Sequence, residues 1–277
     1  MQKTAQEIVQ TLQEAGHEAL FAGGCVRDFL RDVLPKDFDI ATSARPEQIL
    51  ELYPEGDTIG VHFGVILERK GGQHFEIASF REDGDYRDGR RPESVSFSTA
   101  KKDAQRRDFT INGLFYNPVK RELIDYVGGK TDIESKIIRA IGDPEARFEE
   151  DYLRLLRAIR FATVLDFEIE DSTWSAIQAK AANICCVAAE RIRQELDRIW
   201  VNENRLRGFD LLASSGLMKA IYPEIINLQG CEQPPQWHPE GDVFVHTRLM
   251  LSLLPTDASL PLVLSVLFHD IGKPATF

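Results

Sequence analysis

The sequence predicts an α+β protein, with a mixed β-sheet in an N-terminal head and only helices in the remainder. Two observations carry this prediction. Short apolar runs separated by glycine turns are concentrated in the first half of the chain, and such runs are typical of strands. Beyond Val127, apolar residues recur at every third or fourth position, which indicates amphipathic helices.

The expected head elements alternate in type along the chain. Pro35 ends the second helix because proline cannot continue it, and Gly71-Gly72 joins the last two strands in a hairpin. In order, we expect a helix at 2–15, a strand at 19–22, a helix at 26–33, and strands at 38–41, 64–69 and 73–80. Residues 82–94 are rich in charge, glycine and proline and have almost nothing to bury, so we interpret them as a mobile loop.

The remainder is expected to be helical, interrupted by a linker. Pro234, Pro235 and Pro239 indicate that linker. The expected helices span 130–136, 148–163, 171–182, 188–202, 205–214 and 243–254.

Composition excludes several classes of protein. The chain has 277 residues, 43% hydrophobic and 28% charged, which suits one large or two small globular domains. No apolar run is long enough to cross a membrane, and the N-terminus lacks the apolar region of a signal peptide. The four cysteines lack the spacing of zinc ligands. We therefore expect a cytoplasmic protein with no membrane partner.

Charge is distributed unevenly. The net charge of −11 argues against general binding of nucleic acid, because phosphates require local positive charge. Basic residues nevertheless cluster between Arg81 and Arg107, and arginines recur at 147, 154, 157 and 160. A cleft can be basic within an acidic protein.

Asp39 on the expected strand 38–41 and Asp37 just before it are candidate metal ligands. Asp37 and Asp39 are two residues apart, so on a strand both point to one face, while Phe38 and Ile40 point to the other and can pack. Paired carboxylates can hold Mg²⁺ for phosphoryl transfer. Glu76 is a candidate third carboxylate. An isolated pair of this kind is more often a solvated strand face.

The preceding glycine turn is a candidate phosphate cradle. Gly23 and Gly24 let the backbone approach a triphosphate, and the helix that follows offers its N–H groups. Arg27 can donate two hydrogen bonds to phosphate oxygens. Taken alone, two glycines before a helix are more often a plain turn.

Five motifs in order resemble the class II tRNA nucleotidyltransferase and bacterial poly(A) polymerase family. The resemblance covers residues from about 20 to 200. It implies a polymerase-β-like head, a helical neck and a helical body, and an enzyme that adds nucleotides from CTP and ATP to the 3′ end of tRNA. The motifs are Gly23-Gly24-x-Val26-Arg27-Asp28, Lys36-Asp37-x-Asp39-x-Ala41-Thr42, Arg106-Arg107-Asp108-Phe109-Thr110-Ile111-Asn112, Glu150-Asp151-x-x-Arg154-x-x-Arg157-x-x-Arg160-Phe161 and Glu190-Arg191-Ile192-Arg193-x-Glu195-Leu196.

The resemblance implies roles for the residues around Arg107. Arg107 is implied to contact phosphate and Asp108 to contact ribose. The alternative is a charged turn before a buried strand that contains Phe109, Ile111 and Leu114. The family motif usually continues Asn-Ala, whereas here Gly113 follows Asn112.

A carboxylate and a guanidinium in the fourth motif can explain base choice. Asp151 and Arg154 would be neighbours on the expected helix 148–163. Their acceptor and donor complement the Watson–Crick edges of cytosine and adenine, whereas uracil and guanine present a carbonyl to Asp151. Arg157 and Arg160 continue the ridge and could reach the triphosphate or a neighbouring base. The alternative is an amphipathic helix held by ion pairs.

Two further resemblances are weaker. The segment 83–92 resembles the family's flexible loop, which favours a full CCA-adding enzyme. His246-Thr247 and His269-Asp270 resemble an HD phosphohydrolase site, whose last aspartate would lie beyond Phe277. We interpret His238 as a linker residue. The resulting division is a nucleotidyltransferase head (1–138), a helical neck or RNA-binding region (139–235) and the start of a truncated HD domain (236–277).

Several functions remain open at this point. The leading hypothesis is addition of CCA to tRNA. The same motifs occur in poly(A) polymerases and in enzymes that add only CC or only A. Alternatives of other classes are an HD-domain metal-dependent phosphohydrolase and a non-catalytic RNA-binding protein.

Overall fold

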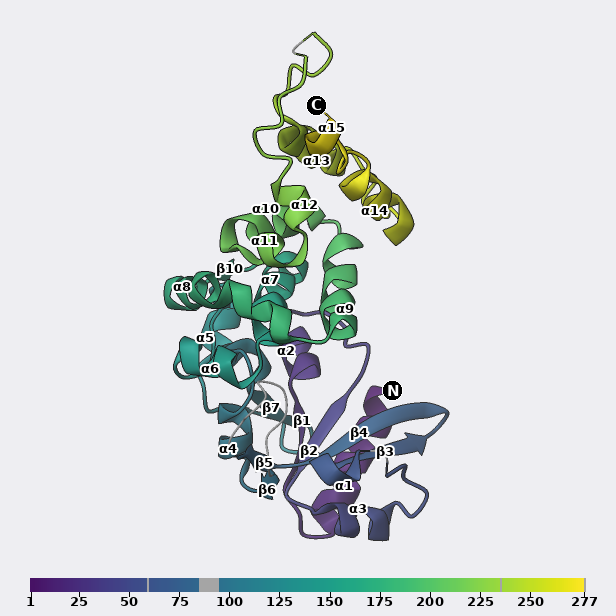
Figure 1. Cartoon of the computed structure of the whole chain (residues 1–277). Helices are drawn as coiled ribbons and strands as arrows, with labels where there is room; N and C mark the ends of the chain where they lie inside the picture. The colour runs from purple at the N-terminus through teal and green to yellow at the C-terminus, as the bar shows by residue number, and fades with distance from the viewer. Residues whose placement is uncertain (59, 85–94, 235, 277) are drawn as a thin grey trace. The chain divides into compact units, whose positions relative to one another are not determined.

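A six-stranded mixed sheet organises the first part of the chain (Figure 1). The computed structural model describes residues 1–58, 60–84, 95–234 and 236–276 and divides them into two compact units, Met1–Asp143 and Pro144–Phe277. The sheet belongs to the first unit, and its strand order is β3-β4-β2-β1-β7-β8. Strands β2 and β4 pair in parallel, and the other pairs are antiparallel.

The first unit contains most of the elements expected for the head. Its helices are α1 (Gln2–Glu14), α2 (Gly24–Leu30), α3 (Pro46–Leu52), α4 (Ala100–Gln105) and α5 (Gly129–Glu134). Its strands are β1 (Ala19–Ala22), β2 (Asp39–Thr42), β3 (Val65–Lys70), β4 (Gln73–Ser79), β5 (Arg81–Asp83), β6 (Val95–Phe97), β7 (Leu114–Asn117), β8 (Glu122–Asp125) and β9 (Ile137–Ile138). Short 3₁₀ helices are η1 (Val61–Phe63) and η2 (Thr110–Asn112).

The predicted amphipathic helix and hairpin are confirmed. Ile8, Val9 and Leu12 of α1 are completely buried, and β3 and β4 pair across Gly71-Gly72 in an antiparallel register. Both glycines have positive φ values, +61° and +74°, a region that favours glycine in tight turns.

Two local predictions in the head are wrong, and the structure tests a third only at residues 82–84. Strand β2 begins only at Asp39, so Asp37 lies outside it. The expected loop at 82–94 overlaps strand β5, which pairs with β6, and its residues 85–94 lie outside the described part of the chain. Instead of a strand containing Phe109 and Ile111, the chain forms η2 before β7.

A buried cluster holds α4 against one face of the sheet. Side chains alternate across a strand, so Asp39 shares the face of Ala41. That face packs Leu20, Ala22, Ala41, Phe80 and Phe115 with Ala100 and Ala104 of α4. Phe38 and Ile40 are buried, and Phe38 meets Phe21 edge to face at 5.2 Å, as expected for the opposite face. The core therefore fixes α4 over the face from which Asp39 projects.

The second unit is helical apart from the two-residue strand β10 (Glu168–Ile169). The expected helix at 148–163 is wrong in one respect, because it breaks at Asp151 and Tyr152. The division into three domains at 138 and 235 stays a prediction. The helices are α6 (Pro144–Glu150), α7 (Leu153–Leu165), α8 (Asp171–Lys180), η3 (Ala181–Cys186), α9 (Ala189–Trp200), α10 (Arg205–Ser215), α11 (Leu217–Ile221), α12 (Pro223–Ile226), α13 (Val243–Ser252), α14 (Leu260–Phe268) and α15 (Lys273–Thr276).

Candidate functional site

The glycine turn lies against an arginine and an aspartate. Gly23 precedes α2 with φ +70° and ψ −124°, a conformation that side chains disfavour. A Cβ at Gly23 would lie 2.8 Å from Arg107 Nη1 and 4.0 Å from Asp39 Oδ2. The turn, β2 and the segment after α4 thus bring three predicted site residues together. Gly24 is also close to Arg27, whose Nη2 would lie 3.7 Å from a Cβ built on Gly24.

Strand register brings a third carboxylate beside Asp39. Ile40 and Ile77 are paired in the parallel β2–β4 ladder, so the residues immediately before them, Asp39 and Glu76, are also neighbours. Opposite residues of a parallel pair project to the same face. Asp37 is exposed and lies two residues before Asp39. Asp37, Asp39 and Glu76 therefore form one acidic group, called the carboxylate group below.

The carboxylate group is electrostatically crowded. Asp39 is exposed as a whole residue, yet loss of solvent around its carboxylate, and then the negative charges of Glu76 and Asp37, raise its pKa to about 6. Arg107 acts in the opposite direction but does not cancel the effect. Like charges this close favour uptake of a proton or a cation.

A buried aspartate that the sequence analysis gave no role orients Arg106 and Arg107, the two arginines of the third motif. Asp103 of α4 is 2% exposed. Its Oδ1 accepts hydrogen bonds from Arg106 at 2.7 and 2.9 Å, and its Oδ2 accepts from Arg107 at 3.0 and 3.1 Å. Burial alone would raise the pKa of Asp103, but the two guanidinium groups outweigh it and lower that pKa. Asp103 is therefore ionised and holds Arg107 in position.

Asn112 links the glycine helix to the third motif. Its Oδ1 accepts a hydrogen bond from Arg27 Nη1 at 2.8 Å, and its Nδ2 donates to Asp108 Oδ1 at 3.1 Å. Asp108 Oδ1 also accepts from the Phe109 backbone N–H at 2.7 Å. The backbone carbonyl of Asn112 accepts from Arg107 Nη1 at 3.2 Å. One asparagine thus connects Arg27, Arg107 and Asp108.

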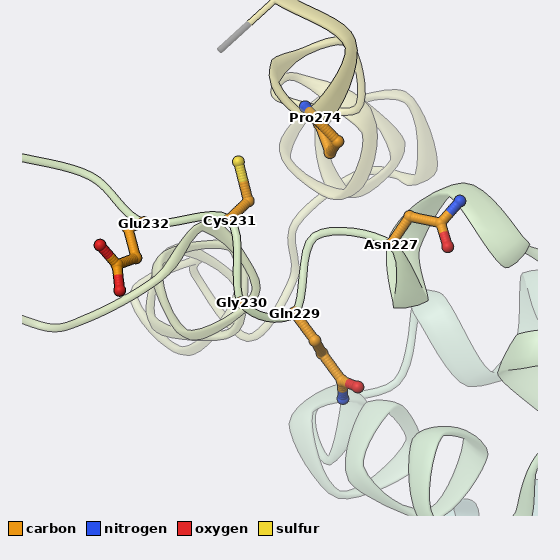
Figure 2. A pocket seen from close by; sticks show the side chains of 6 residues that line it. All are labelled: Asn227, Gln229, Gly230, Cys231, Glu232 and Pro274. Atoms are coloured by element: carbon orange, nitrogen blue, oxygen red, sulfur yellow. The ribbon is translucent and has the colours of Figure 1, made fainter.

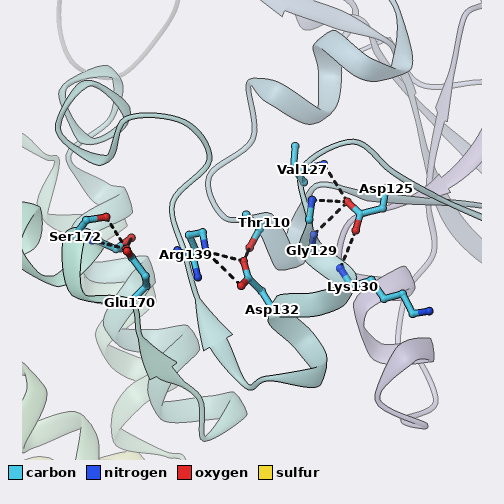
Figure 3. A network of polar contacts seen from close by, with 11 residues as sticks. Thr110, Asp125, Val127, Gly129, Lys130, Asp132, Arg139, Glu170 and Ser172 are labelled. Atoms are coloured by element: carbon cyan, nitrogen blue, oxygen red, sulfur yellow. Dashed lines mark hydrogen bonds and ion pairs between the residues drawn. The ribbon is translucent and has the colours of Figure 1, made fainter.

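A second polar network supports η2 from beneath (Figure 3). Asp125 accepts hydrogen bonds from the backbone N–H groups of residues 127–130 at 2.8 to 3.1 Å, which caps α5. Asp132 of α5 accepts from Thr110 Oγ1 at 2.7 Å and pairs with Arg139. Gly129 approaches so closely that a Cβ there would lie 2.1 Å from the Thr110 carbonyl.

The departure from Asn-Ala in the third motif has a steric explanation. A Cβ on Gly113 would lie 2.7 Å from Val127 Cγ2 and 3.1 Å from Ile141 Cδ1. The packing between η2 and the segment after β8 therefore leaves no room for alanine at this position.

In the second unit, Asp151 lies between two helices rather than within one. Its Oδ1 accepts from the Leu153 backbone N–H at 3.1 Å, which satisfies a donor at the start of α7. Its carboxylate also pairs with Arg191 of α9 at 2.7 Å. The prediction that Asp151 and Arg154 share one helix is therefore wrong, because α6 ends at Glu150 and α7 begins at Leu153.

The three arginines of α7 all have acidic partners. Arg154 is 8% exposed and pairs with Glu150, and its Nη1 donates to the Arg147 carbonyl at 2.8 Å. Arg160, also 8% exposed, pairs with Glu195 of α9, and Arg157 lies 3.8 Å from the same carboxylate. Burial lowers the pKa of Arg160, and Glu195 opposes this effect. The alternative of a helix held by ion pairs thus accounts for these contacts, and base reading stays a prediction.

Four partner residues were not assigned a role from the sequence. Asp103 precedes Arg106 and Arg107 by three and four residues, and this helical spacing was a usable signal. Asn112, Arg191 and Glu195 were quoted as motif letters, but only the folded chain shows what each one holds.

None of the helices in the described part of the chain is both long and apolar enough to cross a membrane.

Two family models match successive parts of the chain. The poly(A) polymerase head domain matches residues 19–139, and a probable RNA and SrmB binding site of polymerase A matches residues 166–228. The first match contains the carboxylate group and the glycine turn. The second contains α9 with Arg191 and Glu195.

The chain is also similar in sequence to proteins that are named CCA-adding enzymes. The chain is 38% identical over 218 residues to a CCA-adding enzyme of Lactobacillus helveticus, a match that covers 78% of this chain and 54% of that protein. It is 37% identical over 254 residues to a CCA-adding enzyme of Limosilactobacillus reuteri, covering 90% of this chain and 62% of the relative. The chain thus spans between half and two thirds of the length of these relatives.

A solved structure has the same fold. The CCA-adding enzyme of Bacillus stearothermophilus in complex with CTP superposes with a TM-score of 0.80 at 30% identity, covering 97% of this chain and 62% of that protein. The first unit therefore has the polymerase-β-like nucleotidyltransferase fold that the motifs implied. With head and RNA-binding models matched in order, this chain belongs to the class II tRNA nucleotidyltransferase and poly(A) polymerase family.

Proposed function

We propose that this chain carries the catalytic part of an enzyme that adds C and A nucleotides from CTP and ATP to the 3′ end of tRNA, releasing pyrophosphate. The observation that carries the proposal is the gathering of Gly23, Asp39 and Arg107 at one edge of the sheet. A backbone turn, a carboxylate and a guanidinium together supply what a metal-bound triphosphate needs. A tRNA substrate makes the cytoplasm the proposed location.

Within the head, each residue has a proposed task. The Gly23-Gly24 turn and the N–H groups of α2 cradle phosphate oxygens, to which Arg27 and Arg107 donate. Asp103 and Asn112 hold those two arginines in place. Asp108 binds the ribose. Because the arginines are already oriented, little side-chain entropy is lost on binding.

Asp37 and Asp39 are the proposed ligands of Mg²⁺, with Glu76 as a third catalytic carboxylate. The crowding that raises the pKa of Asp39 fits a place for a divalent cation, and oxygen ligands suit Mg²⁺. Divalent-metal dependence is general for the family, and Mg²⁺ is our specific choice. Two such ions, held by these carboxylates, would supply a two-metal nucleotidyl transfer, in which the attacking 3′ hydroxyl is activated and the leaving pyrophosphate neutralised.

Base choice is proposed to rest on Asp151 and Arg154. To accept a hydrogen bond from a base amino group, Asp151 would exchange part of its pairing with Arg191. Arg154 would likewise turn a donor from Glu150 towards the base. Arg157 and Arg160 are proposed to assist in nucleotide binding, and Glu195 constrains both.

The names of the relatives favour CCA addition over the other products. A poly(A) polymerase, or an enzyme that adds only CC or only A, would use the same groups and is separated by the assay below. The HD-type phosphohydrolase remains an alternative of another class, and it does not require Asp39.

The test is nucleotide incorporation by the purified chain with Mg²⁺. The substrates are tRNA that lacks CCA, tRNA that ends in CC, and an unrelated RNA, each with labelled CTP, ATP, UTP or GTP. Two C followed by one A on the first tRNA, with UTP and GTP refused, would support the proposal. Long A tails on every RNA would instead identify a poly(A) polymerase.

Two variants sharpen the assay. Asp37→Ala should abolish incorporation, and incorporation that survives would refute the assignment of the metal ligands. Asp151→Asn should reduce discrimination against UTP by about 10- to 100-fold, because a lost or mismatched buried hydrogen bond costs about 1–3 kcal/mol. Unchanged discrimination in a folded Asp151→Asn protein would remove Asp151 from base choice.

A further inference from the structure

Arg27, one of the two arginines proposed to bind phosphate, is already engaged by the carboxylate that follows it in the chain. Its Nε and Nη2 atoms donate hydrogen bonds to Asp28 Oδ1 at 3.0 and 2.9 Å. Its Nη1 atom donates to Asn112 Oδ1 at 2.8 Å. A guanidinium presents the same fork of N–H groups to a carboxylate and to a phosphate, so Asp28 uses donors that a bound phosphate would need.

One of the atoms that Asp28 holds lies close to the glycine turn. A Cβ built on Gly24 would lie 3.7 Å from Arg27 Nη2, and this nitrogen is the one that donates to Asp28 at 2.9 Å. A phosphate oxygen cradled by the turn would therefore compete with Asp28 for Arg27 Nη2.

Asp28 and Asp103 hold their arginines in different surroundings. Asp103 is 2% exposed and pairs with two arginines, one of them Arg107, so releasing Arg107 would leave a buried charge poorly compensated. The Asp28 side chain is 22% exposed, and Arg31 Nη1 lies 3.8 Å from its Oδ1. Asp28 therefore has water and a second guanidinium within reach when it releases Arg27, whereas Asp103 is fixed.

In the empty site, Asp28 compensates the positive charge of Arg27. The Arg27 side chain is 12% exposed, and a largely buried guanidinium without a counter-charge is unfavourable. A triphosphate brings negative charge of its own, which can replace that of Asp28. If both anions stayed on Arg27, they would repel each other. Binding of a triphosphate therefore favours a shift of Asp28 towards Arg31.

We propose that Asp28 competes with phosphate for Arg27: it holds this arginine while the site is empty and releases it when a nucleoside triphosphate or pyrophosphate binds. Asp28 is thus a positioning residue that acts through Arg27. The exchange limits affinity, because phosphate binds fully only to the fraction of chains in which Asp28 has released Arg27. It also assists the departure of pyrophosphate, because Asp28 then recovers its partner. Because Arg27 is itself a proposed phosphate ligand, the exchange rests on the proposed function.

A pocket in the second unit does not provide a further phosphate site. Its volume is about 510 Å³ (Figure 2), and the described residues that line it are Asn227, Gln229, Gly230, Cys231, Glu232 and Pro274. Glu232 is the charged residue in this lining, so the pocket disfavours an anion. We therefore expect pyrophosphate to bind at the glycine turn, with one molecule per chain.

The test is calorimetric titration of the chain with pyrophosphate and with CTP, in EDTA and without tRNA. Asp28→Asn keeps the size of the side chain and an acceptor for Arg27 but removes the negative charge. It should lower the Kd for both ligands about tenfold, as expected if about nine in ten chains hold Arg27 on Asp28. Asp28→Ser, which also removes the charge, repeats the measurement, and circular dichroism should show each variant folded.

The incorporation assay adds a readout that a purely structural role would not give. With CTP and Mg²⁺, Asp28→Asn should lower KM about tenfold and leave kcat equal or lower. Tighter binding of the ground state lowers KM without speeding the chemical step.

The matched control is Asp32→Asn, which removes the same charge just beyond α2. Asp32 is exposed, and asparagine tolerates its φ of +56°. Because exposed charges contribute little, each Kd should change less than about twofold. In an Arg27→Gln chain, Asp28→Asn should also change each Kd less than about twofold, because the gain depends on Arg27.

A Kd for pyrophosphate that is unchanged or higher in Asp28→Asn overturns the exchange and leaves Asp28 as a brace for Arg27. The exchange is also overturned if the gain persists in the Arg27→Gln chain or appears equally in Asp32→Asn. If neither the unmodified chain nor Asp28→Asn binds pyrophosphate, both the exchange and the phosphate cradle are wrong. A chain that shows the expected Kd values but incorporates no nucleotide refutes the proposed function and retains the exchange at Arg27.

Discussion

The carboxylate group of the head places like charges side by side, whereas the ion pairs around α7 and α9 place opposite charges side by side. In the head, Asp39 stands beside Asp37 and Glu76, and Arg107 only partly offsets them, so the pKa of Asp39 rises to about 6. In the second unit, Asp151 faces Arg191, and Arg160 faces Glu195. The head therefore retains an excess of negative charge that a cation can relieve, whereas the ion pairs already fix their side chains.

The largest effect should follow from removing a carboxylate of the head. Asp39→Asn should lower nucleotide incorporation by about 1000-fold or more, because a group that stabilises charge in the transition state is lost. The free energy of unfolding of the Asp39→Asn protein should not fall, because the substitution removes a negative charge that Glu76 and Asp37 repel. The measurement is kcat/KM for CTP together with urea unfolding. Glu122→Gln, an exposed change in β8, is the control, and a strongly destabilised Asp39→Asn protein would contradict the comparison.

The next effect should be structural and confined to the ion pairs. Glu195→Gln leaves the buried Arg160 guanidinium without its counter-charge, and we expect a loss of about 3 kcal/mol in the free energy of unfolding. Urea unfolding measures this loss. Glu190→Gln, an exposed change on the same helix, should be close to neutral.

A double replacement tests whether the buried charge or the shape of the contact is responsible for that loss of stability. Arg160→Met combined with Glu195→Met should recover much of that stability, because apolar groups can replace a buried ion pair at little cost. If the double variant is as unstable as Glu195→Gln, shape rather than charge governs this contact.

A smaller effect should come from the glycine turn. Gly23→Ala should cost about 1–2 kcal/mol of stability, because φ is positive there, and should raise KM for nucleotides about tenfold by pushing against Arg107. Gly72→Ala is the control, because it has φ +74° but nothing within 4 Å of the added Cβ. It should share the stability loss and keep KM. Equal KM values in the two variants would exclude crowding at Arg107.

The smallest effect should be a dependence of stability on pH. Because the folded-state pKa of Asp39 is raised to about 6 from an ordinary 3.8, ionisation in this interval opposes folding. This contribution therefore favours the folded state below about pH 4 and is lost as pH rises through 6. Without divalent metal, the Tm of the unmodified chain should fall relative to that of Asp39→Asn across this interval. Parallel Tm curves would show that the carboxylates are well solvated, and Mg²⁺ at pH 8 should stabilise only the chain with Asp39.

Local patterns predicted much of the fold correctly. The apolar face of α1, the β3–β4 hairpin and the buried positions of Phe38 and Ile40 follow from side-chain periodicity, which the chain carries regardless of its tertiary surroundings. The break at Asp151 was missed because apolar spacing continues through it. There, the aspartate satisfies a backbone donor at the start of α7, and such a cap interrupts a helix without changing its pattern.

The sequence by itself determined the family, the α+β architecture and the identity of the candidate catalytic residues, because ordered motifs and periodicity are local properties of the chain. Only the tertiary structure decided which of these residues meet. Gly23, Asp39 and Arg107 come from separate segments that one sheet and its core bring together. Only the folded chain likewise shows that Asp103 accepts hydrogen bonds from Arg106 and Arg107. It also shows that the His238 ring packs on the His246 ring. Such contacts depend on strand register and helix packing, which arise from side chains distant in sequence.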